Sequence, residues 1–146
     1  MAGIAAGSLI GSSTASANST EARARLTGIT PAGFPAVDGY TPGIIAEGRK
    51  WIFVSGRGPR DRTADMETQM RQTLESIGKV LEAAGASMKD IVNLRCYFVN
   101  IDRGLPAYRK VRKEYLAQPY PACTAVGVAA LASPDLQVEI EAVAVL

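Results

Sequence analysis

The chain contains no histidine among its 146 residues. Histidine is the base of the Ser-His-Asp and Cys-His catalytic systems and a common zinc ligand, so its absence excludes those systems and the zinc sites built on it. Cysteine is almost as scarce. Cys96 and Cys123 lie in separate apolar segments without CxxC spacing, which argues against a disulfide framework or a metal site. Any chemistry must therefore come from carboxylates, arginines, tyrosines, hydroxyls, two thiols and backbone groups.

Long runs of one charge or of apolar residues are also missing. The 16 basic and 14 acidic residues give a net charge of +2 and are spread along the chain, whereas a nucleic-acid-binding surface is normally more basic. The densest basic run, Arg109, Lys110, Arg112 and Lys113, is interpreted as a solvated helix face. No apolar run reaches the roughly 20 residues that span a bilayer. We therefore expect no nucleic-acid partner and no membrane partner.

The composition that remains is that of one globular domain, with 47% hydrophobic and 21% charged residues. The first 17 residues are small or apolar and end in A-S-A, the A-x-A pattern of secretory cleavage sites, but the first basic residue, Arg23, comes after that pattern. Two interpretations of residues 1–30 follow: a flexible tail on a cytoplasmic protein, or the remnant of an export signal on an exported one. The folded domain is predicted at residues 31–146.

The spacing of apolar residues predicts five strands and two helices. In the clearest helix, apolar residues recur every three or four positions until Gly85, which has the place of a left-handed C-terminal cap. The strands are expected at residues 43–46, 51–56, 91–100, 123–128 and 137–145, and the helices at 66–84 and 105–116. The first two strands are expected to pair as a hairpin. The order ββαβαββ predicts an α/β (α+β) fold, with one mixed or antiparallel sheet and both helices on one face.

The last predicted strand has one apolar face and one mixed face. The mixed face carries Glu139 and Glu141, opposite apolar residues that can pack beneath the helices. It also holds Val143, and we expect the neighbouring strand to add Cys123 to it, so this face is too apolar for open water. It is therefore predicted to meet another subunit, with polar groups at the seam forming a pocket shared between chains.

Five short motifs stand out along the chain: Val54-Ser55-Gly56, the helix end KVLEAAGA at 79–86, Asp90-Ile91-Val92, Tyr120-Pro121-Ala122 and the final VEIEAVAV at 138–145. Together they resemble the motifs of the RidA family, also called the YjgF or endoribonuclease L-PSP family. The resemblance covers about residues 38–145. It implies a chorismate-mutase-like fold and a homotrimer with clefts between subunits. The type activity that it implies is hydrolysis of reactive enamines and imines, such as 2-aminoacrylate, with no metal or organic cofactor.

The resemblance also implies roles for particular residues. Glu139 matches the carboxylate that orients or activates the hydrolytic water, which is the group that attack on an imine carbon requires. Tyr40 falls at the position of a tyrosine in the cleft, and Gly56 matches a backbone position that lines the pocket. RNA cleavage, which the family's older name suggests, receives little support from a net charge of +2 and no histidine.

One departure from the family bears on the substrate. Deaminating members carry Pro-Ala-Arg where this chain has Pro121-Ala122-Cys123, and that arginine binds the substrate carboxylate through a bidentate contact. A thiol cannot make this contact, but Arg57 or Arg112 could bring a guanidinium to the same pocket from another wall. Cys123 is expected to line the pocket. A nucleophilic role for it is disfavoured because no histidine can lower its pKa, although a nearby arginine could do so.

Three functions follow from these residues. The leading hypothesis is a small-molecule enzyme that hydrolyses an imine or enamine other than 2-aminoacrylate. The first alternative is a non-deaminating enzyme that uses Glu139 as acid and base for tautomerisation, cyclisation or decarboxylation. The second is a non-catalytic trimer that binds ligands or acts as a chaperone.

Overall fold

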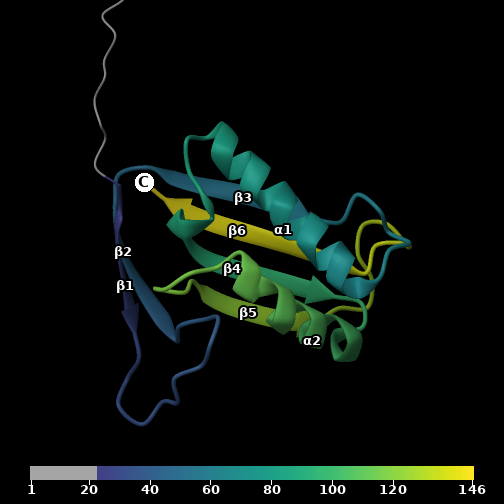
Figure 1. The fold of residues 1–146 in the computed structure, drawn as a ribbon, viewed down its shortest axis with the longest axis horizontal. Helices are drawn as coiled ribbons and strands as arrows, with labels where there is room; N and C mark the ends of the chain where they lie inside the picture. Colours follow the sequence, from purple (N-terminus) through teal and green to yellow (C-terminus); the bar gives the residue numbers. More distant parts are fainter. Residues whose placement is uncertain (1–22) are drawn as a thin grey trace, which may run out of the picture.

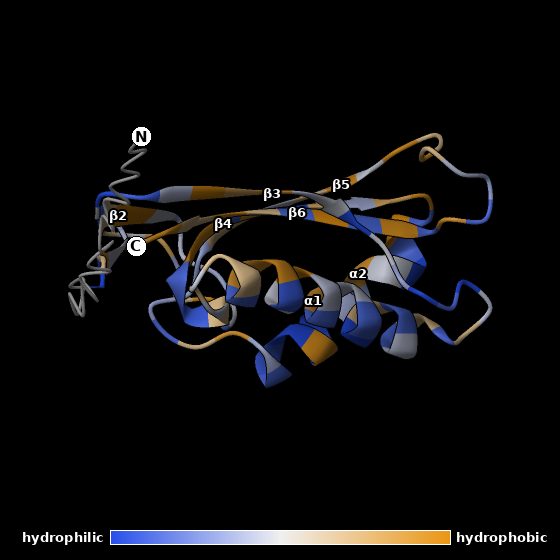
Figure 2. Ribbon diagram, turned by 90° about the horizontal axis from the view of Figure 1, so that it is seen from above, coloured by the Kyte–Doolittle hydropathy of each residue, from blue (hydrophilic) through white to orange (hydrophobic). Residues whose placement is uncertain are grey.

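Alternating apolar residues place the last strand, β6 (Val138–Val145), inside the main sheet, where both of its edges are paired. The computed structural model describes residues 23–146. The strand order is β3 (Trp51–Arg57), β6, β4 (Ile91–Phe98) and β5 (Ala122–Gly127), in which only β4 and β5 run parallel. Helices α1 (Met66–Ala83) and α2 (Ile101–Val111) cover one face of this sheet (Figures 1 and 2). The predicted α+β fold, with a mixed sheet and two helices on one face, is confirmed.

The C-terminal cap of α1 is as predicted, because Gly85 takes the left-handed conformation, at φ +78°, just after the helix. At the other end, the Asp65 side chain caps the helix by accepting a hydrogen bond from the Thr68 backbone N–H. The second helix begins four residues earlier than predicted, at Ile101, because the Asn100 side chain caps it by accepting from the Arg103 N–H. Neither helix has the length and hydrophobicity needed to cross a membrane.

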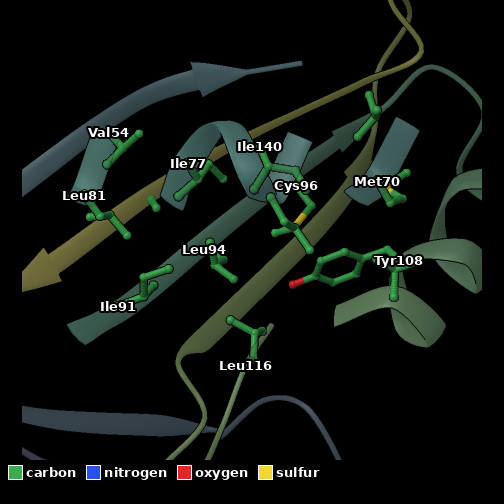
Figure 3. Packing of buried hydrophobic residues seen from close by; sticks show 14 of the residues in the cluster. Val54, Met70, Ile77, Leu81, Ile91, Leu94, Cys96, Tyr108, Leu116 and Ile140 are labelled. Atoms are coloured by element: carbon green, nitrogen blue, oxygen red, sulfur yellow. The ribbon is translucent and has the colours of Figure 1, made fainter. Parts of the chain in front are cut away.

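The core lies between the helices and the sheet (Figure 3). Leu74, Ile77 and Leu81 of α1 are fully buried, as are Leu94 and Ile140 of the sheet. Each such side chain contributes about 1.5–3 kcal/mol when it leaves water. No helix among residues 23–146 covers the opposite face of the sheet, where Trp51 and Phe53 of β3 are exposed.

The N-terminal part of the fold differs from the prediction. Strand β2 (Gly43–Glu47) pairs with β1 (Arg25–Ile29) and not with β3, whose partner is β6. The predicted hairpin is therefore wrong: β3 is an outer strand of the main sheet, paired with β6, whereas β2 forms a separate two-stranded sheet with β1. Strand β1 also falls within residues 1–30, so the folded part of the chain begins before residue 31. The tail and export interpretations otherwise concern residues outside those that the structure describes.

The loop between β1 and β2 folds back onto the edge strand β5. Thr41 forms a bridge with Ala122, its N–H donates to the Pro121 carbonyl at 3.2 Å, and its hydroxyl donates to the Tyr120 carbonyl at 2.9 Å. These contacts hold the segment that carries Asp38 and Tyr40 beside β5 and α2.

Gly104 of α2 allows the helix to approach β4 closely. A Cβ at this position would lie 2.9 Å from Cγ of the buried Phe98 ring and closer still to Cδ1. We predict that Gly104→Ala lowers the free energy of unfolding by about 1–3 kcal/mol, because the overpacked ring has nowhere to move. Gly78→Ala in α1 is the matched control, since its Cβ would meet only Met88 Sδ at 3.8 Å and should gain helix propensity. Denaturant melts compare the two variants, and equal stability would contradict the prediction.

Candidate functional site

The predicted site residues form two groups within the chain. The carboxylate half-site consists of Gly56 and Glu139, on the face of the sheet that the helices leave open. The cationic hollow is a cavity of about 610 Å³ between α2, β5 and the β1–β2 loop. Its walls include Asp38, Tyr40, Tyr108, Arg109, Arg112, Lys113 and Cys123.

A β-bulge builds the carboxylate half-site. Val54 pairs with Ala142, but Arg57 rather than Gly56 pairs with Ile140, so β3 carries one extra residue between these positions. The bulge turns Gly56 towards the open face, where a Cβ would lie 2.6 Å from Cδ of Glu139. Glycine at position 56 therefore leaves the space in which the carboxylate lies.

The two carboxylates of β6 have different surroundings. Glu141 accepts from Arg95 at 2.8 Å and from the Tyr97 hydroxyl at 3.2 Å, so it serves as a structural ion pair on the open face. Glu139 is half-buried, and its side-chain carboxylate forms no hydrogen bond or ion pair with any residue in 23–146. Of the two, only Glu139 keeps all its oxygens available to a water molecule or a substrate.

The same bulge directs Arg57 away from the carboxylate half-site. Its pairing with Ile140 places its side chain on the helix-covered side, where Nε donates to the Ser76 hydroxyl of α1 at 3.0 Å. The structure therefore does not bring Arg57 and Arg112 to the walls of one pocket within the chain. Arg57 belongs to neither half-site.

Arg112 was expected on a solvated helix face, and this interpretation is wrong for it. The side chain is only 6% exposed, because the β1–β2 loop covers it. A Cβ on Gly39, where φ is +92°, would lie 2.6 Å from Arg112 Cζ. The guanidinium carbon lies 5.9 Å from the ring centre of Tyr40 and 5.4 Å from that of Tyr108, both within cation–π range.

The charge of Arg112 is incompletely matched. One Nη donates to the backbone carbonyl of Asp38, while the buried Nε has no hydrogen-bond partner. The Asp38 carboxylate is engaged elsewhere: it pairs with Lys113 at 2.8 Å and accepts from the Tyr120 hydroxyl at 2.8 Å, and these contacts lower its pKa. No ion pair to Arg112 occurs in the described part of the chain. A buried cation of this kind favours an anionic ligand.

Cys123 lies in the hollow, not on the open face. Strands β4 and β5 run parallel with Leu94 opposite Cys123, so both side chains point to the helix side. The expectation that Cys123 adjoins the carboxylates of β6 is therefore wrong. Its Sγ lies 3.4 Å from the Tyr108 hydroxyl, and Figure 3 shows the Tyr108 ring reaching from α2 towards the sheet near Cys96.

Neighbouring groups make Cys123 unusually acidic. A hydrogen bond from the Cys96 thiol, a second from the Tyr108 hydroxyl and the charge of Arg112 lower the pKa of Cys123 to about 7, against the opposing effect of burial. The pKa of Cys96 is raised well above its ordinary value by this hydrogen bond and by burial, and burial raises the pKa of Tyr108. Of the three groups, Cys123 is therefore the one whose anionic form its surroundings favour.

Sequence reasoning missed part of the hollow. Tyr108 and Arg109 line it, as does Asp38, but none of them was proposed. Tyr108 lies four residues before Arg112 and so shares its helix face, a spacing that could have revealed the pair. The position of Asp38 depends on how the loop folds back, and no local pattern indicates it. Among the described residues, no group of three or more Cys, Asp or Glu side chains could hold a metal ion.

The fold and the site define a small α+β protein of the Rid type. Residues 31–146 match the family model described as endoribonuclease L-PSP, so the chain belongs to this family, which is the RidA or YjgF family.

Relatives and solved structures agree with this membership. The chain is 35% identical over 101 residues to a 2-iminobutanoate/2-iminopropanoate deaminase of Dermatophagoides farinae, covering 65% of this chain and 77% of that protein. It is 34% identical over 118 residues to the 3-aminoacrylate deaminase RutC of Acinetobacter baylyi, covering 75% and 89%. The structure of the Rid family protein YyfB from Yersinia pestis has a TM-score of 0.74 at 30% identity, covering 83% of this chain and 98% of that one.

The acidity of Cys123 can be tested through its neighbours. We predict that Cys96→Ala raises the pKa of the Cys123 thiol from about 7 towards the ordinary value, because the largest stabilising hydrogen bond is removed. Tyr108→Phe should act in the same direction but less strongly. Thiolate absorbance, followed against pH, measures both. Cys123→Ser is the control and should lose the titration near 7, and an unchanged midpoint in Cys96→Ala would show that the neighbours do not set it.

Proposed function

We propose that this protein is a deaminase-type hydrolase that converts an imine or enamine bearing a carboxylate into a keto acid and ammonia, with a substrate other than 2-aminoacrylate. The observation that carries the proposal is the unpartnered Glu139 carboxylate, held over Gly56 on the open sheet face. The names of two relatives, a 2-iminobutanoate/2-iminopropanoate deaminase and a 3-aminoacrylate deaminase, support this reaction class.

Glu139 has the chemistry that imine hydrolysis requires. Its carboxylate accepts a proton from a bound water while the water oxygen forms a bond to the imine carbon, and the electron pair of the C=N bond moves to nitrogen. The protonated carboxyl then returns the proton to that nitrogen. The resulting carbinolamine then loses its hydroxyl proton, which passes through the same carboxylate to the amine nitrogen as the C–N bond breaks, so NH3 leaves and the C–O bond becomes the keto group.

Arg112 is the proposed anchor for the substrate carboxylate. It reaches the hollow from the end of α2, whereas the missing family arginine would project from position 123 on β5. Cys123 is shorter than arginine and leaves space at its position, so the acid can be larger or differently shaped than 2-aminoacrylate. Arg109 and Lys113 line the same hollow and add positive charge around it.

A homotrimer is proposed because the two half-sites cannot cooperate within one chain. Glu139 lies on the open face of the sheet, whereas Cys123 and Arg112 lie on the helix side of the edge strand β5. Strands β3 and β5 are the two outer strands of the main sheet, so contact between neighbouring subunits can join the carboxylate half-site of one chain to the cationic hollow of the next. The exposed apolar side chains of the open face support this contact, since Trp51 is 57% and Phe53 75% exposed.

Ammonia release is the direct test of the reaction. Imines generated in solution from a panel of amino acids by an amino-acid oxidase serve as substrates. We predict that Glu139→Gln lowers ammonia release by about 10²-fold or more, because the proton acceptor for water is lost. Glu141→Gln is the matched control, with the same change two residues along the same strand, and should retain turnover because Glu141 pairs with Arg95.

Three outcomes would overturn the proposal. Full turnover in Glu139→Gln would remove its catalytic role, and equal loss in Glu141→Gln would indicate a general effect on the sheet face. No ammonia from any member of the panel would reject deamination and favour a non-deaminating enzyme or a ligand-binding trimer.

The trimer is tested on the open face. We predict that Phe53→Asp converts a species of three times the 15.4 kDa chain mass into smaller ones, because it places a charge in an apolar contact. Val80→Asp on α1 is the control, since Val80 is 37% exposed in the helix layer. Sedimentation velocity measures both. A wild-type monomer, or equal dissociation in the two variants, would contradict the proposal.

A further inference from the structure

The cationic hollow contains a nucleophile that water-mediated imine hydrolysis does not use. Cys123 is half-buried in its wall, and its sulfur lies 3.4 Å from the Tyr108 hydroxyl, at hydrogen-bonding distance. Cys96 itself is fully buried in the core, so Cys123 is the thiol that a ligand in the hollow can meet. Its pKa of about 7 gives a large thiolate fraction near neutral pH.

A second observation points to a ligand at the same place. Arg112 lines the hollow and is only 6% exposed, and its buried Nε has no hydrogen-bond partner. Its only described polar contact is to the Asp38 carbonyl, and the Tyr40 and Tyr108 rings flank the guanidinium. The guanidinium charge therefore has no anionic partner among the described residues, and it lines the same hollow as Cys123.

We propose that Cys123 forms a covalent adduct with unsaturated carboxylates whose carbon–carbon double bond is conjugated to a carbonyl, while Arg112 binds their negative charge. The sulfur lone pair of the thiolate forms the S–C bond. The π electrons move onto the adjacent carbon as an enolate, which takes a proton from water. The product is a thioether, and the step needs no oxidant and releases no leaving group. It rests on the carboxylate-binding role proposed for Arg112 but requires neither Glu139 nor turnover.

The hollow also explains why the electrophile should be an acid. A neutral reagent benefits only from the acidity of the thiol, whereas an anion also forms charge-assisted hydrogen bonds with the guanidinium, which are stronger than neutral ones. The cavity of about 610 Å³ has room for a ligand larger than a three-carbon acid.

The test compares the rates at which 3-benzoylacrylate and its methyl ester form an adduct with the protein. Each rate is divided by the rate at which the same reagent reacts with glutathione. Intact-protein mass spectrometry follows the adduct over a range of pH. We expect the normalised rate of the acid to exceed that of the ester by about tenfold or more, with a midpoint near pH 7 and the adduct mapped to Cys123. Cys123→Ser should abolish it. Equal normalised rates, a midpoint at the pKa of an ordinary thiol, or an adduct on Cys96 would overturn the proposal.

Arg112→Gln should remove the preference for the acid. Lys110→Gln is the matched control, since it removes one charge from the same helix at a residue that pairs with Glu67 outside the hollow, and the preference should persist. If Arg112→Gln does not fold, protection of the wild-type thiol by pyruvate replaces it, and alkylation that pyruvate does not slow would count against the proposal. Glu139→Gln should still be labelled, so loss of ammonia release and loss of labelling are separate failures.

Discussion

The alternation of residues along β6 is the constraint on which the rest of the structure depends. Val138, Ile140 and Ala142 must face the helices to bury their apolar surface. Because successive side chains of a strand point to opposite faces of the sheet, Glu139 has to lie on the other face. Because β6 is paired along both edges, it cannot shift its register to bury Glu139 instead. The same packing that stabilises the core therefore holds a carboxylate on the open face.

The bulge in β3 directs two neighbouring residues to opposite faces of the sheet. One extra residue before the pairing of Arg57 with Ile140 turns Gly56 to the open face, next to Glu139, and turns Arg57 to the helix face, where it binds Ser76. A regular strand would have reversed both. A single backbone irregularity thus provides space for the carboxylate and directs the Arg57 side chain away from it.

At the other end of the sheet, Arg112 and Cys123 line one hollow. Arg112 is buried under the loop at Gly39, and its charge acts with Cys96 and Tyr108 to lower the pKa of the Cys123 thiol. The hollow therefore combines a guanidinium from the end of α2 with an acidic thiol on β5. A buried guanidinium without an anionic partner favours anionic ligands.

Sequence patterns correctly predicted the structural features that depend on residues close together in the chain. The apolar periodicity of α1, its cap at Gly85 and the two faces of β6 are local consequences of side-chain spacing, and they were predicted correctly, as was family membership. The pairing of β2 with β1 and the side on which Cys123 lies were predicted wrongly. Both depend on which distant strand becomes a partner and in which direction it runs, which no local period contains.

The sequence by itself therefore determined the class of fold, the family and the identity of the open-face carboxylate, because these follow from periodicity and from motifs. Only the tertiary structure decided that Arg112 is buried rather than solvated, that Arg57 lies outside both half-sites, and that Cys123 is surrounded by hydrogen-bond donors. The physical reason is that burial, charge pairing and acidity are set by atoms brought together from segments far apart in the chain.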